Sequence, residues 1–329
     1  MGEYTPRPSA SQETAPENRI STEYPYDRAI ANYSVSVEKS VRARFATNDL
    51  AENPLDTEKV VHDTYLQSLP AHAEPNDPYV LELGAANGTF ARRIRNLGYS
   101  GCVVAVDINP HQFSQGYQNT PDSPSRYEER DFIAIGADAS QLPLRDGIFD
   151  LATGLYYLYH VPEKGKALAE MKRVMKPDGT AVFATSAAQN KPEHRNFEAM
   201  MAAELGIEPP RNMNETFTTE TAQILLPDHF KNVFMLEHKT PMIIKTEHDI
   251  NIYLNSLRSM RDQFGEHVEH IPTVEEYEEK LRDVALPIIE SDIDNRGFFT
   301  DRIERAIFFA SDSEDFKAQH PDYTYTRIK

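Results

Sequence analysis

A turn that contains two glycines, Gly84 and Gly88, follows a short apolar run, and an acid, Glu82, precedes the first glycine by two residues. A buried strand that ends in such a turn and opens a helix brings backbone N–H groups to the sheet edge where open α/β sheets bind ligands. The dinucleotide-binding pattern needs glycine at 84, 86 and 89, but Ala86 and Thr89 stand there. A carboxylate at Glu82 suits a ligand with an ammonium group. The turn therefore predicts a ligand site that differs from a nicotinamide dinucleotide site.

Two further acids follow the next apolar runs along the chain. Asp107 comes 23 residues after Gly84, at the end of the second predicted strand, and Asp138 follows the third strand by a few residues. A carboxylate at the end of the second strand can accept hydrogen bonds from both hydroxyls of a ribose. Asp138 is placed to accept from an exocyclic adenine amine. A plain strand-to-helix corner is the alternative interpretation of the turn, and the register of the two later acids argues against it.

Alternating strands and helices must hold these acids in place. Apolar runs and breakers predict strands at 79–83, 102–106, 132–135, 149–154 and 180–185, with helices at 88–97, 110–118 and near 168–175. Such alternation specifies a parallel sheet with helices on both faces. The expected fold class is α/β, with a doubly wound, mostly parallel, seven-stranded Rossmann-like sheet.

The rest of the chain is divided around this core. We expect an N-terminal tail at 1–28, N-terminal helices at 29–76, and a core at 77–186 that is completed by strands within 231–246 and 299–311. Strand-like sequence in these two completing segments is clearest at 233–237 and 303–309. Helical patterns at 187–230 and 247–298 predict a cap over the substrate, and 312–329 is expected to be a C-terminal tail.

Composition narrows the class of partner. The 329 residues carry 52 acids and 34 bases, for a formal charge of -18, so the summed field repels nucleic acid and anionic membranes. A single cysteine and the absence of a long apolar run predict a cytoplasmic protein without disulfides. No cluster of residues predicts a metal site. We expect a small-molecule substrate, no nucleic acid or membrane partner, and a homodimer as the candidate assembly.

Four stretches in order over about 110 residues resemble the class I S-adenosylmethionine (SAM) dependent methyltransferases, in their small-molecule (methyltransferase type 11-like) branch. They are Val80–Phe90, Gly136–Leu144, Phe149–Pro162 and Glu170–Gly179. The departure is Ala86, where the family often has glycine. The resemblance implies a seven-stranded methyltransferase sheet and SAM as the cofactor.

The resemblance also implies roles for individual residues. The amino acid end of the cofactor meets the turn formed by Gly84, Ala85, Ala86 and Gly88 and the backbone near Gly154, with Glu82 beside it. Asp107 and Ile108 hold the ribose and adenine, Asp138 and Ala139 line the other adenine edge, and Tyr33 closes over the cofactor. The alternative interpretation of Tyr33 is a helix residue whose ring packs within the protein and does not contact the cofactor.

The expected reaction is methyl transfer to an N or O atom of a small molecule, such as a specialised metabolite. His160 is the candidate base or orienting group, because it lies on the loop after the fourth strand that in this family faces the transferred methyl. Tyr156, in a run with Tyr157 and Tyr159, either stacks on the substrate or packs. The alternatives are an NAD(P)-dependent Rossmann oxidoreductase, which lacks the required glycines here, and a non-catalytic methyltransferase-like binding protein.

Overall fold

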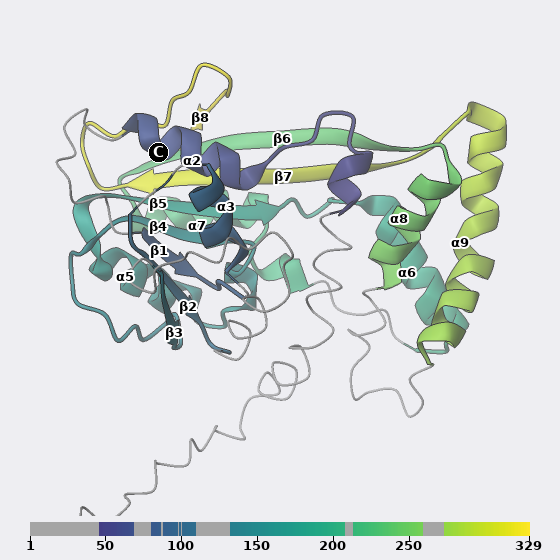
Figure 1. Ribbon diagram of the computed structural model, residues 1–329, viewed down its shortest axis with the longest axis horizontal. Helices are drawn as coiled ribbons and strands as arrows, with labels where there is room; N and C mark the ends of the chain where they lie inside the picture. Colours follow the sequence, from purple (N-terminus) through teal and green to yellow (C-terminus); the bar gives the residue numbers. More distant parts are fainter. Residues whose placement is uncertain are drawn as a thin grey trace, which may run out of the picture.

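The computed structural model describes residues 46–68, 80–86, 88–97, 99, 101–109, 132–207, 213–258 and 273–329. Within these residues the chain forms one eight-stranded sheet with helices on both faces and a group of helices at one end (Figure 1). The expected positions of Tyr33 and of the helix at 110–118 lie outside the described residues. The expected α/β doubly wound class is confirmed.

Five neighbouring strands of the sheet are parallel. They are β1 (Val80–Leu83), β2 (Val103–Asp107), β3 (Phe132–Gly136), β4 (Phe149–Leu155) and β5 (Met175–Ser186), in the order β3-β2-β1-β4-β5. All four residues of β1 are buried, as a central parallel strand covered on both faces requires. The prediction for β5 began too late, because its pairing with β4 already starts at Met175 and passes an irregularity between Phe149 and Leu151.

Two helical layers cover the sheet. On one face α2 (Thr57–Ser68) and α3 (Thr89–Asn96) pack their apolar residues against β1, β2 and β5. On the other face α5 (Lys164–Val174) and α7 (Thr219–His229) do the same. Short 3-10 turns η1 (Thr47–Leu50), η2 (Leu158–His160) and η3 (Met213–Thr216) precede α2, α5 and α7 in the chain. The two layers bury both faces of the sheet, so that a ligand can reach the parallel strands only at their ends.

An antiparallel ribbon continues the sheet beyond β5. The strands β7 (Phe299–Ser311) and β6 (Asn232–Ile244) pair over their full 13 residues, whereas β5 pairs with β7 only from Ala181↔Ala310 to Ser186↔Arg305. The far half of the ribbon therefore projects past the sheet (Figure 1). The sequence predicted shorter strands at 233–237 and 303–309, because charged residues and Pro241 interrupt the apolar signal in the projecting half.

The projecting half carries the helices α6 (Pro192–Glu204), α8 (Glu247–Arg258) and α9 (Val274–Arg296). These three helices and the ribbon share a second apolar core, separate from the two cores that flank the sheet. A capping box starts α9, in which Thr273 accepts from the N–H of Glu276 and Glu276 accepts from that of Thr273, and Gly297 ends it in a left-handed conformation. We call α6, α8 and α9 the cap.

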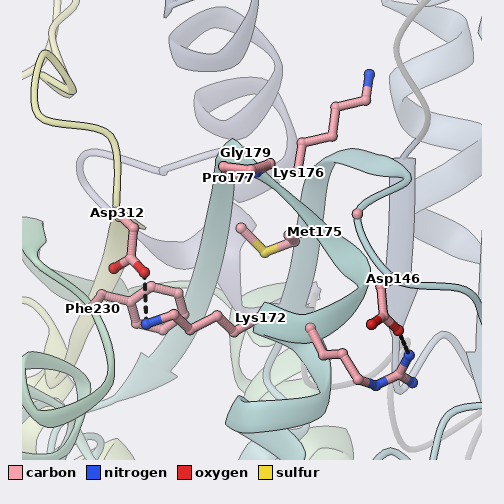
Figure 2. Close-up of a pocket in the computed structure, with 10 residues that line it drawn as sticks. Asp146, Lys172, Met175, Lys176, Pro177, Gly179, Phe230 and Asp312 are labelled. Carbon is pink, nitrogen blue, oxygen red and sulfur yellow. Dashed lines mark hydrogen bonds and ion pairs between the residues drawn. The ribbon is translucent and has the colours of Figure 1, made fainter.

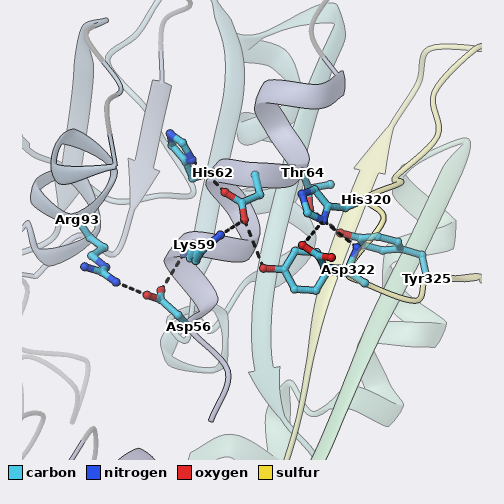
Figure 3. Close-up of polar contacts among 10 residues, drawn as sticks. Asp56, Lys59, His62, Thr64, Arg93, His320, Asp322 and Tyr325 are labelled. Atoms are coloured by element: carbon cyan, nitrogen blue, oxygen red, sulfur yellow. Dashed lines mark hydrogen bonds and ion pairs between the residues drawn. The ribbon is translucent and has the colours of Figure 1, made fainter. Parts of the chain in front are cut away.

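The expected seven strands become eight because the C-terminal segment pairs with the sheet. Strand β8 (Thr326–Arg327) lies antiparallel to β6, where the sequence predicted only a tail. Side chains before β8 also bind α2: the hydroxyls of Tyr325 and Thr64 are 2.5 Å apart, and the Tyr323 hydroxyl donates to Asp63 (Figure 3). A two-residue strand is too short to show a period in the sequence, so only its neighbours identify it.

One buried acid, Asp301 on β7, joins the cap to the ribbon. Its carboxylate is 3 % exposed and accepts from the Tyr253 hydroxyl of α8 at 2.9 Å. It also accepts from the first N–H groups of α6, those of Glu193 at 3.2 Å and His194 at 3.0 Å. A carboxylate at a helix N-terminus satisfies free N–H groups and complements the helix dipole.

We expect Asp301→Ala to destabilise the protein by roughly 3 kcal/mol, because it leaves several buried donors without an acceptor. Urea unfolding measures the loss, and hydrogen exchange should rise first in α6. The matched control is Asp292→Ala, which removes a half-buried surface carboxylate paired with Arg296 one turn away and should cost no more than about 0.5 kcal/mol. Equal losses in the two variants would contradict the anchoring role of Asp301.

Candidate functional site

The three predicted acids lie in a row along the carboxyl ends of the parallel strands. Pairing of Leu83 with Val106 and of Asp107 with Gly136 sets the ends of β1, β2 and β3 side by side. Glu82 is near the end of β1, Asp107 ends β2, and Asp138 follows β3 by two residues. The parallel register therefore brings together acids that are far apart in the sequence.

Asp107 holds the turn after β1 in place. Its Oδ2 accepts from the Ala86 N–H and its Oδ1 from the Asn109 N–H, each at 2.9 Å. Ala86 has a φ of +46°, a left-handed conformation that is unfavourable for a residue with a side chain. The bond to Asp107 stabilises that conformation and offsets part of its cost.

The Asp107 carboxylate keeps acceptor capacity beyond these two bonds. Each carboxylate oxygen has two lone pairs, so each can accept one further donor. Burial raises the pKa of Asp107, and the N–H groups of Asn109 and Ala86 oppose that rise. A ligand that donates two hydroxyls would complete the coordination of this carboxylate.

Glu82 is the most perturbed acid of the row. It is 6 % exposed, and its Oε2 is buried without a hydrogen-bond partner among the described residues. Burial raises its pKa to about 8, although the N–H of Ala91 in α3 favours the charged form. Because a buried unpaired carboxyl is costly, a cation placed beside it would ionise it and gain a strong hydrogen bond.

The remaining predicted cofactor residues lie at the same edge. Asp138 is exposed, and its Oδ1 accepts from the N–H and the hydroxyl of Ser140 at 2.7 and 2.8 Å. Ile108 is 56 % exposed, although it is a large apolar side chain, and Ala139 is half-buried. Gly84 and Gly88 have φ values of +67° and +74°, which glycine adopts without strain.

The end of β4 supplies a residue that the sequence analysis did not separate from its neighbours. The ring of Tyr157 fills the space in front of two glycines: a Cβ on Gly84 would lie 2.4 Å from Tyr157 Cβ, and a Cβ on Gly154 would lie 2.5 Å from Tyr157 Cε1. Both glycines are therefore required by the ring as it stands. The sequence did indicate a close approach here, because Gly154 lies within an apolar strand and precedes the tyrosine run by two residues.

The structure separates Tyr156 from the other tyrosines. Tyr156 packs with α2 and α3, and its hydroxyl lies 3.4 Å from Thr57 Oγ1, whereas Tyr157 and Tyr159 pack on the opposite face of the sheet. His160 ends η2 half-buried, with its ring centroid 4.5 Å from that of Tyr159. The candidate pair Tyr156 and His160 therefore does not share one face, and His160 remains the predicted base.

A pocket of about 280 Å³ lies elsewhere, around Met175 and Gly179 at the start of β5 (Figure 2). Its charges are paired within the chain: Lys172 with Asp312, and Arg173 with Asp146. It lies at the opposite edge from the row of acids, because β5 runs parallel to β1 and starts at this edge. Among the described residues, no three His, Cys, Asp or Glu side chains gather as a metal site would require.

The wedged ring predicts a coupling between Gly154 and Tyr157. Gly154→Ala should destabilise the protein by about 1–3 kcal/mol through overpacking, and by less than about 0.5 kcal/mol when Tyr157→Ala has removed the ring. Thermal and urea unfolding of the two single variants and the double variant measure this difference. Gly165→Ala in α5, where a Cβ would meet nothing closer than 3.9 Å, is the control and should show no coupling to Tyr157→Ala. Additive effects of Gly154→Ala and Tyr157→Ala would show that the ring does not press on Gly154.

Comparisons with known proteins identify the central part of the chain. Residues 81–183 match the family model described as "Methyltransferase domain". A demethylmenaquinone methyltransferase of Paenarthrobacter aurescens (strain TC1) is 38% identical over 118 residues, which are 36% of this chain and 42% of that protein. A malonyl-[acyl-carrier protein] O-methyltransferase of Geobacter sulfurreducens is 34% identical over 105 residues, 32% of this chain and 37% of that protein.

The chain thus spans less than half the length of these two relatives. Among solved structures, the YcgJ protein of Bacillus subtilis is 17% identical, with 77% of this chain and 99% of that chain covered and a TM-score of 0.45. No helix in the described part of the chain is long and apolar enough to cross a membrane. Residues 81–183 are therefore similar to methyltransferase domains, in agreement with the resemblance that the motifs at the ends of β1 to β4 carry.

Proposed function

We propose that this protein moves the methyl group of SAM to an N or O atom of a small molecule, such as a specialised metabolite. The observation that carries the proposal is the Glu82 carboxyl, which is buried with Oε2 unpartnered in line with Asp107 and Asp138. A ligand that fits this row must bring a cation to Glu82 and hydrogen-bond donors to the two aspartates. SAM has an ammonium, two ribose hydroxyls and an adenine amine in that order.

The described residues fit this cofactor. Glu82 would accept from the ammonium, Asp107 from the ribose hydroxyls with Ile108 beside the adenine, and Asp138 with Ala139 would line the other adenine edge. The turn from Gly84 to Gly88 leads into α3, and the N-terminus of a helix favours a carboxylate. Ile108, exposed as it stands, would gain an apolar surface to pack against.

When bound, SAM supplies a methyl group that its sulfonium already activates for in-line displacement. The chain therefore has to orient the nucleophile, exclude water and remove a proton where the acceptor is a hydroxyl. An amine needs only to lose its proton before it attacks. His160, on the loop after β4, is the residue of this chain proposed to take that proton or to orient the acceptor.

The net charge and the names of the relatives bear on the class of methyl acceptor. The net charge of -18 disfavours nucleic acid as the acceptor. Two relatives of the central domain are named for demethylmenaquinone and for malonyl-acyl carrier protein, and so for different acceptors. The acceptor of this chain would be set outside residues 81–183, and the cap is the described segment that differs in kind from the core.

Cofactor binding should release a proton from Glu82. With its pKa raised to about 8, Glu82 is mostly protonated at pH 7 in the free protein, and an ammonium beside it would ionise it. Titration calorimetry with SAM at pH 7, in two buffers of different ionisation enthalpy, should show release of close to one proton. Glu82→Gln, the matched variant that cannot ionise, should release none and bind at least tenfold more weakly. Absence of SAM binding to the wild type would contradict the proposed function, and NAD titrated in the same way tests the oxidoreductase alternative.

His160→Ala should lower turnover at least a hundredfold while it leaves SAM affinity unchanged, because a positioned base contributes roughly 100- to 10,000-fold. The measurement is transfer of labelled methyl from SAM to compounds in a metabolite extract, with the labelled product then used as the assay. His320→Ala, in the C-terminal segment, is the control and should keep turnover within about twofold. A His160→Ala protein that retains most of its turnover between pH 6 and 9 would assign the residue to packing.

A further inference from the structure

The side chain of Tyr157 is wedged between the ends of two neighbouring strands. Its Cβ, Cγ and Cδ2 lie 2.4–2.7 Å from the position of a Cβ on Gly84, after β1, and its Cε1 and Cδ1 lie 2.5 and 3.1 Å from that of a Cβ on Gly154, in β4. The two glycines thus meet opposite edges of one ring. Tyr157 is 7 % exposed, so the ring is seated and does not sample solvent at this position.

The ring of Tyr157 lies at one end of the row of acids. Burial raises the pKa of Tyr157 well above its usual range, and the charge of Asp138 adds to that rise. Tyr157 follows β4, and the carboxyl ends of β3, β2, β1 and β4 lie next to one another in that order. This is the line along which the proposed cofactor would run from its amino acid end to its adenine.

The residue before Tyr157 has a strained backbone conformation, and hydrogen bonds hold the main chain on both sides of this pair. Tyr156 has a φ of +54°, a left-handed conformation that is costly for a residue with a ring. Its N–H is tied to the Ala184 carbonyl of β5 at 2.8 Å, and on the other side the His160 N–H donates to the Tyr157 carbonyl at 2.8 Å. These two hydrogen bonds hold the backbone on both sides of the Tyr156–Tyr157 peptide.

We infer that Tyr157 is a gate, which closes the cofactor crevice between Gly84 and Gly154 in the free protein and must swing out before SAM can bind. The inference rests on the proposed function, because it concerns the same crevice. Glycine at both positions makes room for the ring in the closed state and for the cofactor in the open one. The gate also shields Gly84 and the turn from water until the cofactor arrives.

A gate of this kind has thermodynamic and kinetic consequences. The apparent affinity for SAM is reduced by the fraction of molecules that are open, so removal of the ring should tighten binding. In the wild type the observed rate of binding should reach a plateau at the opening rate as the SAM concentration rises. Without the ring, the rate should stay proportional to concentration.

The test compares SAM binding in the wild type and three variants by calorimetry and by stopped-flow tyrosine fluorescence, which no tryptophan obscures in this chain. Tyr157→Ala should bind SAM at least tenfold more tightly and lose the plateau, whereas Tyr157→Phe, which keeps the ring, should behave as the wild type. Tyr277→Ala, which removes a fully buried tyrosine of the cap, controls for general destabilisation and should leave SAM affinity unchanged. Tyr157→Leu replaces Tyr157→Ala if the latter does not fold.

Three other outcomes overturn the gate. Weaker binding in Tyr157→Ala would make the ring a contact of the cofactor, and unchanged binding with unchanged kinetics would make it a packing residue. If neither the wild type nor Tyr157→Ala binds SAM, the proposed function fails and the gate fails with it. Binding by Tyr157→Ala alone would support the gate in its strongest form.

Discussion

The hydrogen bond from the Ala86 N–H to the Asp107 carboxylate is the contact on which the site depends. It ties the turn after β1 to the end of β2 and keeps a non-glycine residue in a left-handed conformation. Because the turn also starts α3 and lies against Tyr157, its shape decides both the position of the backbone N–H groups and the seat of the ring. A change of one main-chain torsion there would disturb both.

Burial of acids at this edge stores electrostatic free energy. Glu82 and Asp107 both have pKa values raised by desolvation, and the positive partners that would offset this are few. Glu82 meets mainly the N–H of Ala91 and the more distant charge of Arg92. A protein that only needed a stable core would gain by an apolar residue at this position. The carboxyl therefore costs folding free energy, as the proposed cationic ligand would require.

The ribbon of β6 and β7 connects the cap to the sheet without a hinge loop. Its near half completes the sheet and its far half forms the floor of the cap core, so that the same two strands belong to both. Asp301 then fixes α6 and α8 to the ribbon through buried hydrogen bonds. The cap is thus positioned by main-chain pairing, which is more rigid than a flexible linker.

The sequence by itself determined the parallel core, the turn and the three acids, because strand periods, glycines and acids at strand ends are local signals. The resemblance of residues 81–183 to a methyltransferase domain could therefore be stated before any contact was known. Only the tertiary structure decided the length of β6 and β7, the pairing of β8, and the separation of Tyr156 from Tyr157. These features depend on which segment each residue packs or pairs against. The sequence of a two-residue strand or of a tyrosine run does not show which segment that is. The position of the Tyr157 ring depends on residues elsewhere in the chain, because Gly84 and Gly154 have no side chain where the ring lies.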